Sequence, residues 1–97
     1  MRIVRNSSYH SDLRKIVQYI SKDNSTSALG IFDRIEGAVG RLGQFPHSGR
    51  SGRILSTREP VISGTPYIVV YSVGAEVVVM RVLHGAQKWP KHLNPRS

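Results

Sequence analysis

Residues 64–73 read "GTPYIVVYSV", and this stretch decides the fold. Turn residues open it, and the β-branched and aromatic run that follows predicts a strand. A strand alternates its side chains between two faces. Both faces are apolar here, with Tyr67, Val69, Tyr71 and Val73 on one and Ile68 and Val70 on the other. Both must therefore be covered, and a partner protein, a second copy or the chain's own tail could cover the second.

Length and charge narrow the class of protein. A chain of 97 residues predicts a single domain over residues 1–97 with one modest core, and an irregular tail from about residue 86. It carries 14 Lys and Arg against 6 Asp and Glu, a net charge of +8. Such a surface attracts nucleic acid, acidic proteins or anionic membranes.

The remaining composition favours the cytoplasm. There is no cysteine, hence no disulfide or thiolate chemistry. The start "MRIVRNSSYH" lacks the apolar core of a signal peptide, and no apolar run approaches the roughly 20 residues that span a bilayer. We expect a soluble cytoplasmic protein.

Two helices precede the main strands. "RIVRN" predicts a first strand over residues 2–6. One helical stripe then predicts a helix over residues 8–22, and a second predicts one over residues 25–42, ending at Gly43 with Pro46 beyond. Their apolar residues are Tyr9, Leu13, Ile16, Val17 and Ile20 in the first, and Ala28, Ile31, Phe32, Ile35, Val39 and Leu42 in the second.

The second half of the chain is β-rich. "RILS", "EPVIS", "PYIVVYSV" and "EVVVMRVLHG" have strand composition and are separated by turn residues, although Pro60 indicates an edge or a bulge. The predicted fold class is α+β, with order β-α-α-β-β-β and a helical hairpin packed on one face of a mainly antiparallel sheet.

Four segments resemble a known family. "DLRKIVQYI", "FPHSGRSGR", "TREPVISGTPYIVVYSV" and "VVVMRVLHGAQKWP" occur in the order and spacing of the RelE/ParE toxins of type II toxin–antitoxin modules. The resemblance runs from Asp12 to Pro90 and is closest to the ParE-like branch. One departure is Pro60, where an apolar residue is usual after the glutamate. The resemblance implies the RelE/ParE-like fold and a cognate antitoxin, typically acidic, that wraps the hairpin and sheet.

The resemblance implies two functions. ParE-like members bind DNA gyrase and inhibit growth, which is the leading interpretation. RelE-like members cut mRNA in the ribosome, which is the alternative. Those nucleases usually carry an arginine where this chain has Ile68, and this departure favours the ParE-like activity. A nuclease here would rely on His84, Arg81, Arg58 and Tyr71.

Candidate contact residues can be named for both the antitoxin and the target. Strand residues Tyr67, Val69 and Tyr71 are expected to bind the antitoxin. The residues expected to bind the target are Arg50, Arg53, Arg58, Arg81 and Trp89. Two of these have structural alternatives: Arg58 could pair with Glu59 at a strand edge, and Trp89 could pack the tail onto the sheet. The four histidines lack metal-ligand spacing, so no metal or cofactor is predicted.

A composition-only hypothesis also stays open. A small basic chain can be a nucleic-acid-binding domain without toxicity. A neighbouring gene for a small protein with a DNA-binding N-terminus and an acidic tail would favour the toxin.

Overall fold

A computed structural model of the chain describes residues 1–60 and 62–93. β1 (Ile3–Arg5) leads into α1 (Ser7–Ser21) and α2 (Ser25–Arg41), followed by β2 (Arg50–Ser51), β3 (Arg58–Glu59), β4 (Tyr67–Val73) and β5 (Val77–His84). The strands form one sheet in the order β1-β5-β4-β3-β2. β1 pairs with β5 in parallel, and the other pairs are antiparallel. The predicted α+β arrangement is confirmed, with β2 as an additional short strand.

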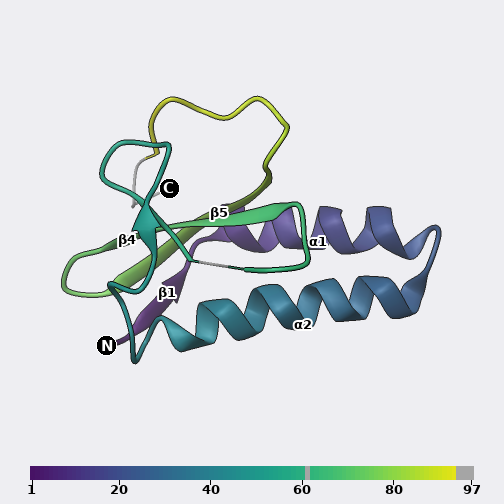
Figure 1. Ribbon diagram of the computed structural model, residues 1–97, viewed down its shortest axis with the longest axis horizontal. Coiled ribbons are helices and arrows are strands. Elements are labelled where there is room, and N and C mark those ends of the chain that lie inside the picture. Colours follow the sequence, from purple (N-terminus) through teal and green to yellow (C-terminus); the bar gives the residue numbers. More distant parts are fainter. Residues whose placement is uncertain (61, 94–97) are drawn as a thin grey trace.

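The two helices form an antiparallel hairpin on one side of the sheet (Figure 1). Asn24 begins α2, where its side-chain oxygen accepts a hydrogen bond from the Ser27 N–H at 3.0 Å. Such a cap satisfies one of the N–H groups that the first turn leaves unpaired. Both helices begin and end within one residue of the bounds that the apolar stripes predicted.

β4 and β5 form the centre of the sheet. Their register runs from Tyr67 opposite His84 to Val73 opposite Val77. It shifts between Val70, which faces Arg81, and Tyr71, which faces Val79, so Met80 is an extra residue in β5. A bulge of this kind changes the phase of side-chain alternation. Strict alternation would place Val82 on the face opposite Val79, and the bulge instead brings both into one core cluster.

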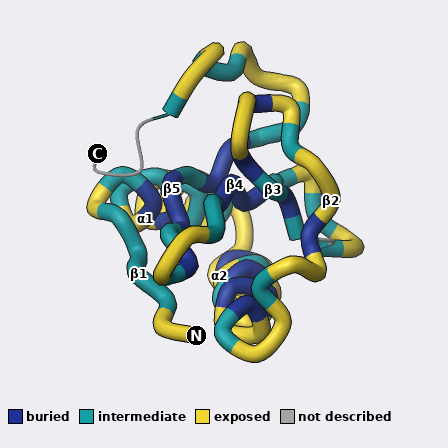
Figure 2. Tube along the Cα trace, turned by 90° about the vertical axis from the view of Figure 1, so that its left-hand side faces the viewer, coloured by how far each residue is buried: buried dark blue, intermediate teal, exposed yellow. Residues whose placement is uncertain are grey.

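Each face of the sheet has its own apolar cluster. The larger one joins the helices to β4 and β5 through Tyr9, Leu13, Ile35, Val39, Leu42, Val69, Tyr71, Val77, Val79 and Val82. The smaller one consists of Ile54, Val70 and Leu83, with Trp89 and Leu93 of the tail packed against it. The 52–57 loop and the tail lie on the side of the sheet away from α2 (Figures 1 and 2). The chain's own loop and tail thus cover the second face of β4.

Two strand predictions were wrong near β2 and β3. "RILS" lies between β2 and β3, where Ile54 is buried in a loop instead of a strand. "EPVIS" contributes only Glu59 to β3, because Pro60 has no N–H to continue the ladder. Val61 of this segment lies outside the described residues. The described part of the tail is irregular, as expected.

Candidate partner-binding surfaces

Glu59 organises the β2–β3 region from inside. Its side chain is 2% exposed, and its two oxygens accept the Arg53 N–H at 2.9 Å and the Arg50 guanidinium at 3.5 Å. A buried carboxylate requires such partners, because water no longer solvates its charge. The ion pair that the sequence suggested between Arg58 and Glu59 is replaced by one between Arg50 and Glu59. Neighbouring residues of a strand point to opposite faces, and this explains the change.

Arg58 holds the preceding loop instead. Its guanidinium donates hydrogen bonds to the carbonyl oxygens of Gly49 at 2.8 Å and His47 at 3.4 Å. The Arg50 side chain remains 69% exposed despite its contact with Glu59. Of these two predicted target contacts, Arg50 is the more accessible, whereas Arg58 also has a structural role.

Arg81 is bound to α1. Its Nε and Nη2 donate to the two carboxylate oxygens of Asp12 at 2.6 and 2.9 Å, and the Val82 N–H donates to the same carboxylate at 3.1 Å. These hydrogen bonds raise the pKa of Arg81 above its ordinary value. β1 leaves β5 after Val79, so Asp12 satisfies a strand edge that would otherwise lack a partner.

His84 ends β5 and starts the tail. Its Nδ1 accepts a hydrogen bond from the Ala86 N–H at 3.0 Å, which places the proton of the neutral ring on Nε2. Its ring meets the edge of Tyr67 with 5.5 Å between centroids. Burial, followed by the neighbouring Tyr19, raises the pKa of Tyr67. Tyr67 and His84 are thus two groups capable of acid–base chemistry that lie in contact.

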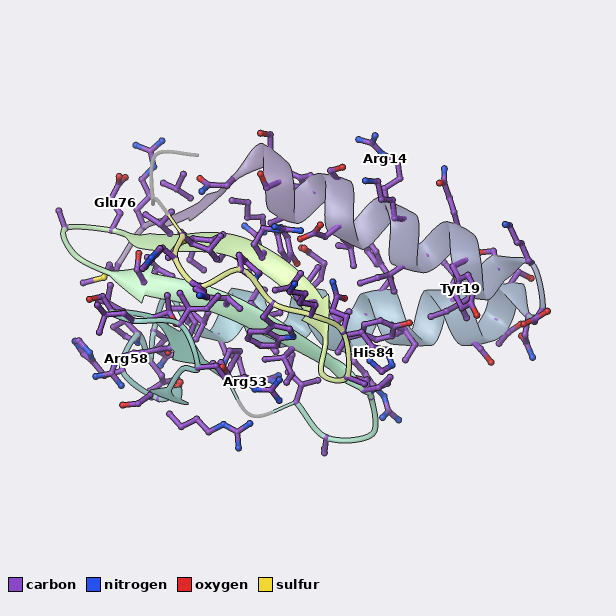
Figure 3. The ribbon with its side chains drawn as sticks, turned by 90° about the horizontal axis from the view of Figure 1, so that it is seen from above. Arg14, Tyr19, Arg53, Arg58, Glu76 and His84 are labelled. Atoms are coloured by element: carbon purple, nitrogen blue, oxygen red, sulfur yellow. The ribbon has the colours of Figure 1, made fainter. Side chains whose placement is uncertain are left out.

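The four candidate nuclease groups are not gathered. Arg58 and His84 lie well apart in Figure 3, and Arg81 is held by Asp12. Tyr71 is fully buried, and its hydroxyl donates to the Pro46 carbonyl at 2.8 Å and accepts the Gly49 N–H at 2.9 Å. Tyr71 therefore fixes the loop before β2 and has no face toward solvent.

Burial also corrects the expected antitoxin contacts on β4. Val69 and Tyr71 are both 0% exposed inside the larger core cluster. Neither side chain can meet a partner without unfolding the sheet, so we do not retain them as contact residues. Tyr67 is partly exposed at the end of the strand and stays a candidate.

An apolar groove between α1 and α2 was missed by the sequence patterns. It is about 380 Å³ in volume and is lined by His10, Leu13, Arg14, Val17, Gln18 and Phe32. Phe32 belongs to the apolar stripe of α2, yet it is 39% exposed, and Tyr19 and Leu29 on the same hairpin are 69% and 64% exposed. The apolar stripes of the two helices are wider than packing on one sheet face requires, and this excess width was the sign of the groove in the sequence. We call this feature the hairpin groove.

Trp89 packs the tail onto the sheet, as one of its two predicted roles required. Its indole N–H donates to the His84 carbonyl at 2.9 Å. The guanidinium of Arg53 lies over the ring, and its Nη1 donates to the Gly85 carbonyl at 2.9 Å. Two predicted target contacts are therefore in contact with each other. The described residues contain no group of three or more His, Cys, Asp or Glu placed to hold a metal ion.

The structure thus defines a small basic α+β protein with an apolar hairpin groove. No helix of its described part is long and apolar enough to cross a bilayer. The fold is shared with a solved structure titled "Chromosomal ParDE TA system from P. aeruginosa", with a TM-score of 0.74. The match has 20% identity and covers 87% of this chain and 95% of that chain.

Comparison of sequences gives the family. The family described as "ParE toxin of type II toxin-antitoxin system, parDE" matches residues 5–89. The chain is 43% identical over 81 residues to Y4kP of Sinorhizobium fredii, covering 84% of each protein. It is 28% identical over 98 residues to Toxin ParE3 of Caulobacter vibrioides, covering 99% of this chain and 98% of that protein. The chain belongs to the ParE toxin family of type II toxin–antitoxin systems.

Proposed function

We propose that this ParE-family toxin inhibits growth by binding an essential protein, DNA gyrase, and that a cognate acidic antitoxin neutralises it in the cytoplasm. The observation that carries the proposal is the dispersal of the groups a nuclease would need. His84, Arg81 and Tyr71 each make fixed contacts with other parts of the chain. An inhibitor that acts by binding needs charge and shape at an exposed surface and does not need a proton relay.

The hairpin groove is the proposed antitoxin site. It is apolar between two helices, which is the geometry that receives the apolar face of an amphipathic helix. Arg14 lines it, and the chain carries a net charge of +8. An acidic antitoxin segment would thus be attracted at long range and held by apolar contacts at short range.

The alternative is a ribosome-dependent mRNA endonuclease, and the Tyr67–His84 contact is the observation that favours it. The raised pKa of Tyr67 favours its neutral phenol, which can donate a proton but is a poor base near neutral pH. The hydrogen bonds of His84 are made with Gln87, Ala86 and the Trp89 indole, and none of these groups is a cation that could neutralise a reacting phosphate. We therefore rank this activity second.

One experiment separates the two functions. The toxin is induced in cells, and in parallel purified toxin is added to a gyrase supercoiling assay and to a translating extract. Loss of supercoiling without mRNA cuts is the expected result. Cuts within codons at the ribosomal A site, with supercoiling intact, would replace gyrase binding by RNA cleavage. If induction of the toxin does not slow growth, both functions are rejected.

A further inference from the structure

The 52–57 loop holds one apolar side chain out in solvent. Leu55 is 81% exposed, the highest exposure among the large apolar residues of the described chain. Its neighbour Ile54 is 2% exposed and belongs to the smaller core cluster. Single exposed apolar residues are common on proteins, so the exposure of Leu55 alone carries no conclusion. What distinguishes Leu55 is how firmly the chain fixes it.

Hydrogen bonds close the loop on itself. The Gly52 N–H donates to the Thr57 carbonyl at 2.9 Å, and the Thr57 N–H and hydroxyl both donate to the Ile54 carbonyl, at 3.2 and 2.6 Å. Buried Glu59 holds the Arg53 N–H from below. A loop ordered in the free protein loses little further entropy when it binds, and this increases the affinity that its contacts can give.

The backbone next to Leu55 is strained. Ser56 has a φ of 62°, a left-handed conformation that is uncommon for a residue other than glycine. Such conformations persist when the surrounding structure imposes them, and they concentrate at functional sites. Here the strain turns the chain between the buried Ile54 and the buried Thr57, and so it presents Leu55 outward.

A hollow of about 570 Å³ lies beside Leu55. Its lining includes Leu55 and Val73 as apolar walls, with His47, Arg53 and Arg58 as basic groups. Glu59, the carboxylate that follows Arg58 in the chain, is 2% exposed and is bound by Arg53 and Arg50. Arg50, with its side chain 69% exposed, adds positive charge next to the loop. The surface is therefore an apolar projection beside a concave, cationic wall.

Leu55 and the hairpin groove are on different sides of the molecule. Ile54 packs with Val70 and Leu83 in the cluster opposite the helix-facing core. Figure 2 shows the exposed loop segment beyond β3, away from α2. A partner seated in the hairpin groove would leave Leu55 free.

We infer that the 52–57 loop and its hollow form the surface through which this toxin docks on its protein target, at an apolar socket bordered by carboxylates. The inference rests on the proposed function, which it deepens by naming the contact surface. Leu55 enters the socket, while Arg50 and Arg58 face the acidic border. An exposed aliphatic side chain gains free energy when it is buried in an apolar protein pocket, whereas single-stranded nucleic acid is held by stacking on aromatic side chains. The antitoxin occupies the other side.

The test compares Leu55→Ser with Leu29→Ser, a matched change at a residue that is 64% exposed on α2. Four quantities are measured: colony survival over a graded series of toxin levels, affinity for the cognate antitoxin, binding to a short DNA duplex, and the thermal midpoint. Leu55→Ser is expected to need about tenfold more toxin for equal killing, because its apolar side chain is no longer buried on binding, with antitoxin affinity and midpoint unchanged. Leu29→Ser is expected to kill like the parent.

Each other result has a defined meaning. Leu55→Ser that kills like the parent overturns the inference and leaves the proposed function standing. Equal loss of killing and of antitoxin affinity moves the loop to the antitoxin interface and also overturns it. A lowered midpoint in Leu55→Ser would show that Leu55 stabilises the free fold instead of serving as a free anchor, and this would overturn the inference. If Leu55→Ser weakens binding to a short DNA duplex as much as it weakens killing, the loop is a nucleic-acid surface, and the inference is overturned. A parent chain that does not kill rejects the proposed function, and the inference with it.

Discussion

The guanidinium carbon of Arg53 lies 4.3 Å from the centroid of the Trp89 ring. This contact joins the β2–β3 loop to the tail across the second face of the sheet. Cation–π contacts contribute about 0.5–2 kcal/mol, depending on solvent exposure. Together with the Trp89 packing on the smaller core cluster, the contact explains how so short a chain covers both faces of β4.

Removal of the indole should therefore weaken the fold. Trp89→Ala is expected to lower the free energy of unfolding by about 2 kcal/mol, less than for a fully buried tryptophan because Trp89 is half-buried. The measurement is a urea titration followed by circular dichroism. Lys88→Ala, at an exposed neighbour, is the control. An unchanged midpoint in Trp89→Ala would mean that the tail does not contribute to the core.

Asp12 should be a stabilising residue of α1. Asp12→Ala removes both hydrogen bonds to the Arg81 guanidinium and the one to the Val82 N–H. We expect a loss of about 1–3 kcal/mol, since hydrogen bonds to charged groups are among the stronger ones and Arg81 is only partly exposed. Asp33→Ala on the exposed side of α2 is the control. Equal thermal midpoints for the two variants would contradict this role of Asp12.

Stability should decline at high pH because of Tyr9. Burial, reinforced by a 2.6 Å hydrogen bond to Glu36, raises the pKa of Tyr9 far above its usual value near 10. The folded chain therefore keeps this proton more tightly than the unfolded chain. The contribution of Tyr9 to the free energy of unfolding is fully present below about pH 10 and is lost as the pH rises above it. One such proton contributes a slope of up to about 1.4 kcal/mol per pH unit.

The variant Tyr9→Phe isolates this contribution. Unfolding by urea is measured at several pH values between about 9 and 11, which bracket the usual tyrosine pKa. We expect a shallower decline in Tyr9→Phe than in the parent, because the variant has no Tyr9 hydroxyl to ionise. Some decline should remain, because Tyr67, whose pKa is also raised, is present in both proteins. Identical slopes would show that Tyr9 ionises as readily in the folded chain as in the unfolded one.

A change in the hairpin groove should weaken antitoxin binding without weakening toxicity. Phe32→Glu places a negative charge in the groove, where it opposes both apolar contact and an acidic partner. We expect at least a tenfold loss of antitoxin affinity, with toxicity retained and no longer suppressed by the antitoxin. Phe45→Glu, at a residue 55% exposed outside the groove, serves as the control. Full protection of cells carrying Phe32→Glu would place the antitoxin elsewhere.

His84 should be dispensable for killing. In His84→Gln, the side-chain oxygen can accept the Ala86 N–H, but proton transfer near neutral pH is lost. A toxin that acts by binding is expected to keep full potency, measured as colony survival at matched expression. A harmless His84→Gln protein with an unaltered thermal midpoint would favour catalysis and the endonuclease alternative.

Local patterns were sufficient for the helices and the two long strands. The stripes from Tyr9 to Ile20 and from Ala28 to Leu42 predicted both helices, and the apolar run after Pro66 predicted β4. Ordered segments across the chain also indicated the family. These features depend on residues close in sequence, where a period of 3.6 or 2 reports the buried face directly.

Other features exist only because distant residues meet. Asp12 and Arg81 are 69 residues apart, and no spacing in the sequence marks them as partners. The extra residue Met80 in β5 placed Val82 with Val79, a change of phase that composition does not reveal. The same applies to Glu59, whose partner Arg50 lies on the neighbouring strand.

The sequence by itself determined that β4 needs two covers, and the tertiary structure decided what they are. Val69 and Tyr71 face the helices, whereas Val70 faces Ile54, Leu83 and the tail. The surfaces that we propose for partners are therefore the hairpin groove and the 52–57 loop, and on β4 only Tyr67, at the end of the strand, stays a candidate contact. The physical reason is that burial is a property of the whole packed chain. An apolar residue can find its cover wherever the fold brings apolar surface, whatever the separation in sequence.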